Sequence, residues 1–238
     1  MYVEMKHRES ADYGIPTRDV RLPATVRQGE LAATVADLSN DATVTSILVQ
    51  YPLPGHLDYF ATLAQIDPNK DVDGLHPINL GLLTAGEKTG IIPCTPRGIV
   101  TLLERADVVF EQANIVVVGR GLTVGRPLSI LLGTSTFGYN ATVTVCHSRS
   151  ADLARYCRSA DIVVAAAGSP GLITSDMVHP DLVVVSAGVS FVDGRATPDI
   201  ALDARETIAA FTTTTGAVGP MTRAYLFANA LENAQRVT

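Results

Sequence analysis

Tyr2 and Lys6 stand four residues apart at the start of the chain. Residues at this spacing share one face of a helix, so a phenol ring and an amine would point into the same space. A lysine transfers protons near neutral pH only when its surroundings lower its pKa. Lys6 is therefore a candidate acid/base group, provided that other segments of the chain bury it.

Two later segments offer polar groups for such a site. Gln50 lies between a β-rich run and a proline-stiffened loop, which would hold its amide rigidly, although an isolated glutamine there is often a surface residue. Asp71 and Asp73 flank a single valine, and a carboxylate can accept a forked pair of N–H groups from a substrate ring. The same carboxylates could bind a metal, but no third or fourth oxygen ligand has matching spacing, so no metal is expected. His76 fits a structural role as well as a functional one.

A glycine-rich segment follows the apolar run Ile115–Val118. It reads Gly119-Arg120-Gly121-Leu122-Thr123-Val124-Gly125, and a helix is expected directly after it. Glycines in such a turn let the backbone approach a phosphate group at the helix N-terminus. The spacing is one residue longer than the common dinucleotide-binding pattern, and a purely structural turn is the alternative. We predict that Gly119, Arg120 and Gly121 bind a nucleotide cofactor.

The next expected strand ends just before Ser148 and Arg149. NAD enzymes usually carry an acidic residue there for the ribose hydroxyls, whereas a hydroxyl and a guanidinium suit a 2′-phosphate. We therefore predict NADP rather than NAD, with Arg120 as a second cation; the alternative is that Arg149 is a solvated loop charge. Two loops, 166–171 and 186–189, should line the same crevice, with the backbone of Val189 at the nicotinamide end.

Helical and strand-like stretches alternate along the chain, which predicts an α/β fold. The continuous apolar runs in the second half are typical of parallel strands buried on both faces. Helices are expected at 2–13, around Leu31, Val35 and Leu38, at 56–65, at 96–103 with Thr95 as N-cap, and at 221–235 after Pro220. Strands are expected at 17–22, 45–49, 115–118, 141–146, 162–166 and 182–185.

Composition narrows the class of protein. The 238 residues are 47% hydrophobic and carry a net charge of −6 without a basic stripe, so nucleic-acid binding is not expected. The longest apolar run, Ile162–Ala167, is too short to span a bilayer, and no membrane association is expected. Because no basic segment followed by an apolar one opens the chain, we expect a cytoplasmic protein. The three cysteines lack metal-ligand spacing, so neither a disulfide framework nor a zinc site is expected.

Taken in order, these segments resemble the bifunctional methylenetetrahydrofolate dehydrogenase/methenyltetrahydrofolate cyclohydrolase family. The resemblance runs from Tyr2 to the C-terminal helix. The shared motifs are Tyr-Val-x-x-Lys, Val-Gln-x-Pro-Leu-Pro, Lys-Asp-Val-Asp-Gly-x-His-Pro, Pro-Cys-Thr-Pro-x-Gly, Gly-Arg-x-x-x-Val-Gly-x-Pro and Val-Gly-Pro-Met-Thr.

The resemblance implies two α/β domains around a cleft. Residues 1–108, completed by a returning C-terminal helix in 213–238, would form the folate-binding catalytic domain, and residues 109–212 a Rossmann-like NADP-binding domain. It also implies the NADP-dependent oxidation of 5,10-methylenetetrahydrofolate to the methenyl cation and its hydrolysis to 10-formyltetrahydrofolate. This is a step of one-carbon metabolism that supplies purine and amino-acid biosynthesis. A homodimer formed through the cofactor domain is implied as well.

The resemblance also implies roles for the candidate residues. Lys6 would be the acid/base group of hydrolysis, and Gln50 would hydrogen-bond to it. Tyr2 would stack on the aminobenzoyl part of the folate, Asp73 would hold the pterin, and Pro220 would border the substrate.

Some segments depart from the family pattern. The family begins with another helix and strand before Tyr2. The loop Thr213-Thr214-Thr215-Gly216-Ala217 replaces Pro-Val-Pro-Gly-Gly, Ser186-Ala187-Gly188 replaces Asp-Val-Gly, and Gly121 replaces a serine. These changes should affect cofactor affinity and the dehydrogenase rate more than the fold. They leave two alternatives open: a non-catalytic or single-activity folate- or nucleotide-binding paralogue, and a dehydrogenase acting on an unrelated small substrate.

Overall fold

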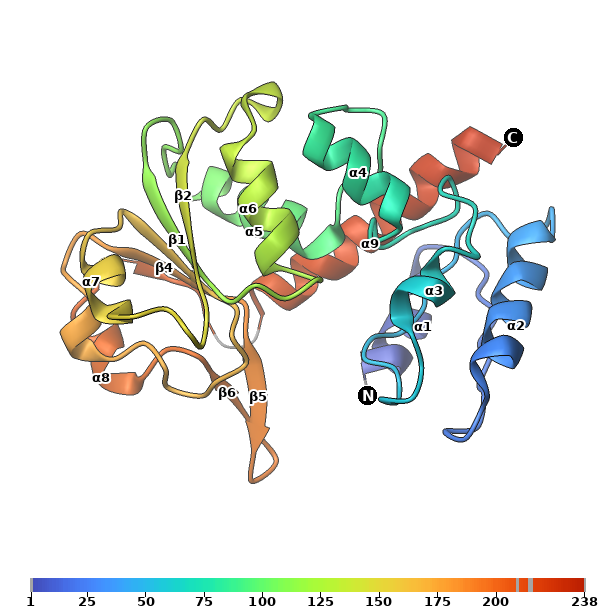
Figure 1. The fold of residues 1–238 in the computed structure, drawn as a ribbon, viewed down its shortest axis with the longest axis horizontal. Helices are drawn as coiled ribbons and strands as arrows, with labels where there is room; N and C mark the ends of the chain where they lie inside the picture. Colours follow the sequence, from blue (N-terminus) through green and yellow to red (C-terminus); the bar gives the residue numbers. More distant parts are fainter. Residues whose placement is uncertain (1, 209, 214–215, 238) are drawn as a thin grey trace.

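A five-stranded parallel sheet forms the centre of one half of the molecule (Figure 1). The computed structural model describes residues 2–208, 210–213 and 216–237. The strands lie in the order β2-β1-β3-β4-β7, and every neighbouring pair is parallel. Their bounds are Asn114–Val118 (β1), Thr142–Cys146 (β2), Ile162–Ala165 (β3), Val183–Ser186 (β4) and Ala210–Phe211 (β7). The four strands predicted from apolar runs are confirmed to within one residue at each end.

Helices cover both faces of this sheet. Within β1, Ile115 and Val117 pack into a core with helices α5 and α6, whereas Val116 and Val118 pack into a core with α7 and α8. Burial on both sides explains why the strands are continuous apolar runs rather than alternating ones. The helices span Cys94–Arg105 (α5), Gly125–Gly133 (α6), Leu153–Arg158 (α7) and Leu202–Arg205 (α8), and two 3-10 turns span Ser135–Phe137 (η1) and Ser175–Met177 (η2).

The strand order reverses at β1. The chain leaves β1 for β2 on one side and then passes to β3 on the other side of β1. This reversal is the topological switch point of the sheet, and ligands of doubly wound sheets bind there, in the crevice beyond the carboxyl ends of the strands. The glycine turn 119–125 and the loop 166–171 both begin there, because they follow β1 and β3 directly.

An antiparallel hairpin, which the sequence did not predict, projects from the sheet half (Figure 1). It consists of β5, Val189–Val192, and β6, Arg195–Pro198. Asp193 and Gly194 form its turn, with φ of 49° and 75°. An Asp-Gly pair between short β-rich runs is a known hairpin signal, so this hairpin could have been predicted from the sequence.

The other half of the molecule is mainly helical. Its helices span Tyr2–Asp12 (α1), Gln28–Asn40 (α2), Tyr59–Leu63 (α3) and Pro77–Ala85 (α4). Leu31 and Val35 of α2 pack with Leu63 of α3, Ile47 and Leu75. Gly14 follows α1 with φ of 70°, as expected of a helix C-cap. The helices predicted at 2–13 and around Leu31 are confirmed, whereas the one predicted at 56–65 is shorter because Asp58 caps it.

Two predicted strands in this half are wrong. Residues 17–22 are exposed, lie between Pro16 and Pro23, and belong to no helix or strand. Residues 45–49 make a single parallel bridge, between Ile47 and Asp71. A β-rich segment becomes a strand only when a neighbour runs beside it. Among the described residues, only the short stretch around Asp71 does so.

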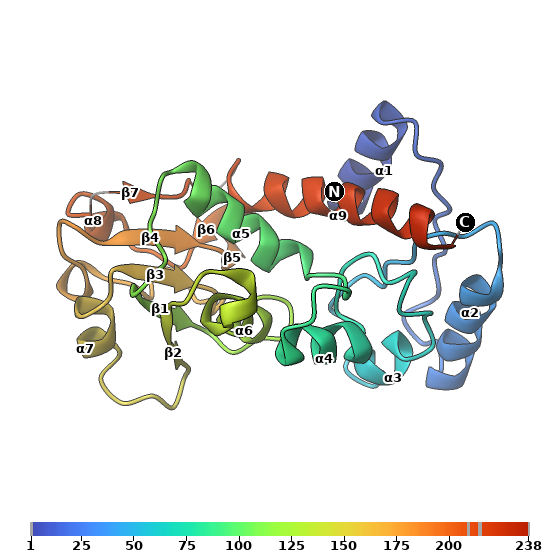
Figure 2. The same ribbon diagram turned by 90° about the horizontal axis from the view of Figure 1, so that it is seen from above.

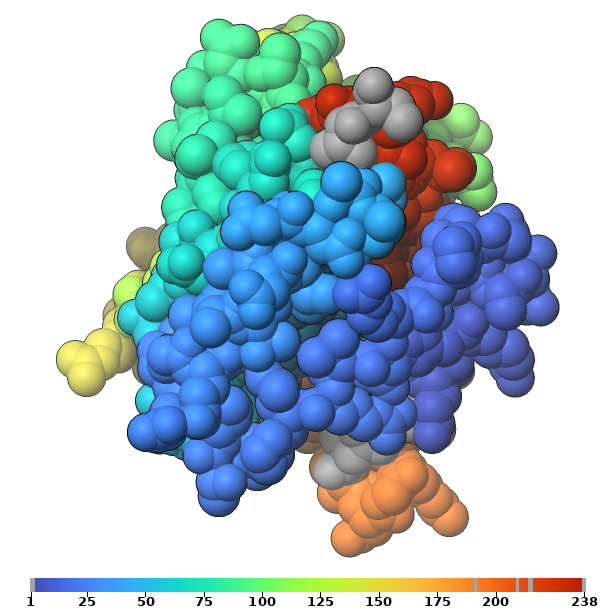
Figure 3. All heavy atoms as spheres, turned by 90° about the vertical axis from the view of Figure 1, so that its right-hand side faces the viewer, coloured from blue at the N-terminus to red at the C-terminus, as the bar shows by residue number. Residues whose placement is uncertain are grey.

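The last helix, α9, Val218–Val237, connects the two halves (Figures 1 and 2). It packs along α5 so closely that a Cβ on Gly98 would lie 3.0 Å from the Cβ of Met221. In the space-filling view, the C-terminal part of α9 lies beside the light-blue and cyan segments of the helical half (Figure 3). The same view shows the hairpin projecting in orange.

The start of α5 differs from the prediction. This helix begins at Cys94, not at Pro96, and Thr95 is not its N-cap.

The described residues contain no helix long and apolar enough to cross a membrane. Within the same part of the chain, no group of three or more His, Cys, Asp and Glu residues is placed to hold a metal ion. Cys94, Cys146 and Cys157 are buried free thiols.

Candidate active site

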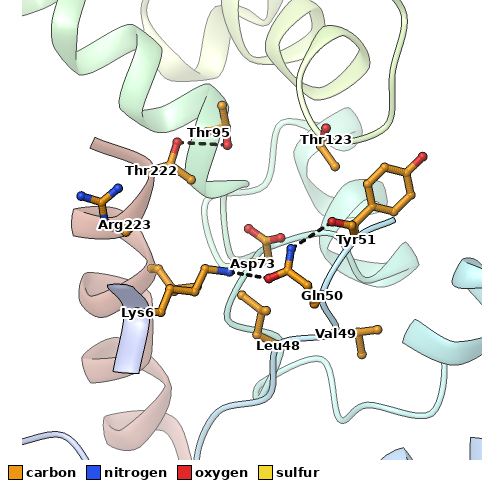
Figure 4. A pocket seen from close by; sticks show the side chains of 11 residues that line it. Lys6, Leu48, Val49, Gln50, Tyr51, Asp73, Thr95, Thr123, Thr222 and Arg223 are labelled. Atoms are coloured by element: carbon orange, nitrogen blue, oxygen red, sulfur yellow. Dashed lines mark hydrogen bonds between the residues drawn. The ribbon is translucent and has the colours of Figure 1, made fainter. Parts of the chain in front are cut away.

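A pocket of about 190 Å³ lies between α1, α9, the segment 48–51 and the glycine turn (Figure 4). Three residues predicted from separate motifs, Lys6, Gln50 and Asp73, line it together. The remaining lining residues are Leu48, Val49, Tyr51, Thr95, Thr123, Thr222, Arg223 and Leu226. Because Thr123 belongs to the glycine turn, the pocket extends from Lys6 toward the switch point of the sheet.

Lys6 and Gln50 are in direct contact. The Nζ atom of Lys6 donates a hydrogen bond of 3.0 Å to Oε1 of Gln50 (Figure 4). The Nε2 atom of Gln50 donates to the carbonyl of Tyr51 at 2.9 Å, which turns the amide oxygen toward the amine. Helix α1, which carries Lys6, is attached to α9 by an ion pair of 2.7 Å between Glu9 and Arg223.

The surroundings of Lys6 lower its pKa. Burial lowers the pKa of Lys6, and the positive charge of Arg223 lowers it further, whereas Asp73 and Cys94 act in the opposite direction. Loss of hydration explains the dominant effect, because the ammonium form loses more on leaving water than the amine does. A lysine with a lowered pKa is suited to accept and return a proton near neutral pH.

Asp73 faces the same space. Burial and the charge of Asp71 raise its pKa to about 6, although Lys6 and a hydrogen bond from the Cys94 thiol oppose the increase. Asp71 itself is a structural residue. Its carboxylate accepts hydrogen bonds from the amides of Gly74 (3.1 Å) and His76 (2.8 Å), and from the Asn79 side chain (2.9 Å).

His76 caps a helix. Its Nδ1 atom accepts a hydrogen bond of 3.0 Å from the amide of Ile78 at the start of α4. Burial lowers the pKa of this imidazole, so its neutral, accepting form is favoured. The structural alternative for His76 therefore agrees with the geometry, and the side chain does not line the pocket.

The raised pKa of Asp73 predicts a pH-dependent effect of Asp73→Asn on stability. Below the ordinary pKa of 3.8 the carboxyl is protonated in both the folded and the unfolded chain, whereas above about 6 the folded chain must bury the charge. The wild-type protein therefore loses stability as the pH rises through this interval, and the variant does not. We expect the free energy of unfolding of Asp73→Asn to exceed that of wild type by about 1–3 kcal/mol at neutral pH. Near pH 4 the two free energies of unfolding should be equal.

Urea unfolding at several pH values measures this difference. Asp181→Asn, at an exposed aspartate before β4, is the matched control and should leave the pH dependence unchanged. A stability difference between wild type and Asp73→Asn that does not vary with pH would contradict the assignment.

The glycine turn is shaped by two close backbone contacts. Gly119 has φ of +123°, and a Cβ there would lie 2.3 Å from the carbonyl oxygen of Ala166. A Cβ on Gly125 would lie 2.1 Å from the carbonyl oxygen of Gly119. Both positions therefore require glycine, and these contacts fix the shape of the turn at the start of α6, where backbone amides can meet a cofactor phosphate. At Gly121, by contrast, a Cβ would meet no atom within 4 Å.

The predicted 2′-phosphate residues lie near this turn. The amide of Gly119 donates to the carbonyl of Cys146 at 2.8 Å, so the turn adjoins the end of β2, where Ser148 and Arg149 follow. Arg120, Ser148 and Arg149 are all exposed at the carboxyl edge of two neighbouring strands. The side chains present thus fit a phosphorylated dinucleotide.

Other predicted site residues lie outside the pocket. Val189 is 40% exposed at the start of the hairpin, and Pro220 is exposed in the first turn of α9; neither lines the pocket. Helix α1 includes Tyr2, whose side chain lies outside the described residues, as do Thr214 and Thr215 of the altered loop.

The sequence interpretation overlooked four polar lining residues. Thr95 and Thr222 occur in the quoted motifs, and their hydroxyl oxygens are 3.1 Å apart, which connects the first turns of α5 and α9. Thr123 occurs in the glycine segment, so the sequence indicated that it could lie near the cofactor site. Arg223 had no signal in the sequence, because only the packing of α9 on α1 brings it to the pocket.

A doubly wound sheet with a glycine turn at its switch point, opening toward a half-buried lysine, is the arrangement of a two-domain nucleotide-binding enzyme. The chain belongs to the tetrahydrofolate dehydrogenase/cyclohydrolase family. The model of its NAD(P)-binding domain matches residues 93–238, and the model of its catalytic domain matches residues 1–73.

Solved structures agree with this assignment. The bifunctional FolD methylenetetrahydrofolate dehydrogenase/cyclohydrolase of Campylobacter jejuni is 36% identical, with a TM-score of 0.92 over 99% of this chain and 83% of that one. The Trypanosoma brucei enzyme complexed with NADP cofactor and inhibitor is 37% identical, with a TM-score of 0.90 over 99% and 82%. The bifunctional enzyme of Thermoplasma acidophilum is 31% identical, with a TM-score of 0.89 over 99% and 84%.

Proposed function

We propose that this protein oxidises 5,10-methylenetetrahydrofolate with NADP+ and hydrolyses the resulting methenyl cation to 10-formyltetrahydrofolate. The observation that carries the proposal is the hydrogen bond between Lys6 and Gln50 in a pocket that reaches the glycine turn. NADP, when bound along that turn, supplies the hydride acceptor for the methylene carbon. The backbone contacts at Gly119 and Gly125 fix the turn that would hold its phosphates.

Lys6 manages the protons of hydrolysis. In its neutral form it accepts a proton from water as the water oxygen bonds to the methenyl carbon. When the bond from this carbon to the folate nitrogen N5 breaks, the protonated amine supplies the proton that N5 gains, and the carbinol hydroxyl loses one. One proton is released per turnover. The carbonyl of Gln50 orients the amine throughout, and the cationic carbon attracts water without a metal.

The substrate lies across the same pocket. Asp73 accepts N–H groups of the pterin ring and Tyr2 stacks on the aminobenzoyl ring, whereas Pro220, which does not line the pocket, borders a part of the folate that reaches beyond it. The position of Asp73, which faces the pocket beside Lys6, supports this role. Its partial negative charge also stabilises the cationic intermediate that forms beside it.

A direct assay tests the function. Purified protein mixed with methylenetetrahydrofolate and NADP+ should produce NADPH and the methenyl absorbance together, followed by decay of the methenyl signal as hydrolysis proceeds. Ligand binding without turnover would support the alternative of a non-catalytic paralogue. Turnover in the first step alone would indicate a single-activity enzyme.

The cations beside the glycine turn predict cofactor preference. Replacing Arg149 with aspartate removes a 2′-phosphate partner and supplies an acceptor for ribose hydroxyls, so kcat/KM for NADP+ should fall by about 10²-fold, while that for NAD+ rises. Steady-state kinetics with both cofactors measures the change. Arg195→Asp, at the exposed hairpin end, is the matched control. Equal losses with NADP+ and NAD+ would contradict a role in 2′-phosphate recognition.

We also propose a domain organisation and an assembly for this protein. Residues 1–108, completed by 213–238, form the folate domain, and residues 109–212 the NADP domain, with Val189 near the nicotinamide. The packing of α5 along α9 supports the return of the C-terminal helix. The protein forms a homodimer through its cofactor domain, works in the cytoplasm and supplies purine and amino-acid biosynthesis. Sedimentation equilibrium should give twice the mass of the chain, and a monomer at micromolar concentration would refute the dimer.

A further inference from the structure

Asp199 is a fully buried carboxylate directly after β6. It accepts hydrogen bonds from three consecutive backbone amides, those of Ala167 (2.7 Å), Gly168 (3.0 Å) and Ser169 (2.7 Å). Asp199 is 0% exposed, and none of the ion pairs among the described residues includes it. Hydrogen bonds to a charged acceptor are about twice as strong as neutral ones, so these three fix the loop after β3.

The same loop is held from the hairpin side at a second point. Ser190 of β5 donates its hydroxyl to the carbonyl of Gly168 at 3.0 Å. Gly188, just before β5, makes room for the carboxylate, because a Cβ there would lie 2.0 Å from Oδ2 of Asp199. Of the altered Ser186-Ala187-Gly188 segment, the glycine is thus the residue that this contact requires.

This loop lies at the switch point, opposite the glycine turn. The carbonyl of Ala166, at its start, lies directly against Gly119. Consecutive amides that point into one concavity form an anion site. Here Asp199 occupies that site, so these amides are not available to a cofactor phosphate, and the phosphates must bind at the glycine turn.

The strand order assigns the loop to one half of the cofactor. Ser148 and Arg149 follow β2 on one side of β1, whereas the loop follows β3 on the other side. A dinucleotide with its adenosine end over β2 and its pyrophosphate at the turn after β1 would place its nicotinamide end over β3. The loop held by Asp199 would then border the nicotinamide half.

We propose that Asp199 is a positioning residue for NADP, which holds the loop 167–169 in the shape that the nicotinamide half requires. This inference rests on the proposed function. Hydride transfer depends on the angle and distance of the nicotinamide ring, so a displaced loop impairs cofactor binding and oxidation. Hydrolysis uses no hydride acceptor and takes place beside Lys6, so it is unaffected.

Asp199→Asn tests the inference. An asparagine side chain has one acceptor oxygen, and its amide nitrogen would face an N–H donor, so at least one of the three contacts is lost. The dissociation constant of NADPH, measured by its fluorescence, and the KM for NADP+ should rise by about 10- to 100-fold. Hydrolysis of methenyltetrahydrofolate should stay within about twofold of wild type. Asp193→Asn, in the turn of the same hairpin, is the matched control and should match wild type in all three measurements.

Two results would overturn the proposal. One is unchanged NADPH affinity in folded Asp199→Asn protein; the other is a parallel loss of NADPH binding and hydrolysis, which would indicate a general structural role. If Asp199→Asn does not fold, Ser190→Ala decides, because it loosens the same loop from the partly exposed hairpin. It should raise the KM for NADP+ about threefold without affecting hydrolysis, and an unchanged KM would refute the role of the loop. The NADPH titration reports on Asp199 even if the wild-type protein turns over no folate.

Discussion

Replacing Lys6 with methionine should reduce the hydrolysis of methenyltetrahydrofolate by about 10³-fold, within the range that general acid–base catalysis provides. Methionine is similar in length and apolar, so it fills the space of the side chain without exchanging protons. The hydrogen bond to Gln50 is lost as well, but this glutamine retains its contact with the carbonyl of Tyr51. The pocket should therefore keep its shape and lose its proton carrier.

The measurement separates chemistry from binding. The decay of methenyl absorbance gives kcat, which should fall, whereas the KM for the folate should change only severalfold. Lys88→Met, at an exposed lysine after α4, is the matched control. Hydrolysis at the wild-type rate in Lys6→Met protein would refute the mechanism, whatever the effect on oxidation.

Replacing Gly125 with alanine should weaken the binding of NADP by at least about 10²-fold. The new Cβ would lie 2.1 Å from the carbonyl oxygen of Gly119 and 2.7 Å from its carbonyl carbon. Both are backbone atoms and cannot rotate away as a side chain would, so the turn must open. The start of α6 would then move from the position where its amides meet a phosphate. We also expect a stability loss of about 1–3 kcal/mol, as for other overpacked sites.

Gly81→Ala, at an exposed glycine of α4 outside the cofactor turn, is the matched control. A Cβ at Gly81 meets no atom within 4 Å, so this variant should bind NADPH as wild type does. Fluorescence titration with NADPH and thermal unfolding of both variants give the comparison. Equal effects of the two substitutions would show that close packing of β1 against α6 does not shape the cofactor site.

The sequence was most informative where local pattern and burial coincide. The apolar runs of β1 to β4 are buried on both faces, so their composition alone identified them to within a residue. The glycine turn could be recognised for a related reason, since a backbone contact at Gly119 and another at Gly125 exclude every other side chain. Patterns of this kind reflect constraints that act over a few residues.

Other elements depended on neighbours distant in the chain. Residues 17–22 and 45–49 have strand-like composition, yet a strand requires a partner for its backbone, and no adequate one lies beside them in the described structure. No sequence motif around Asp199 indicates its role. Its function as a hydrogen-bond acceptor exists only because the hairpin brings it to a loop 30 residues away.

The sequence by itself determined the motif-bearing residues, their order and the family they indicate, because side-chain chemistry and spacing are written along the chain. The tertiary structure decided which of them meet. It brought Lys6 of α1 to Gln50, 44 residues on, placed Arg223 of α9 beside both, and left Val189 and Pro220 outside the pocket. The physical reason is that burial and the resulting pKa of a lysine depend on what surrounds it in space, which spacing along the chain does not define.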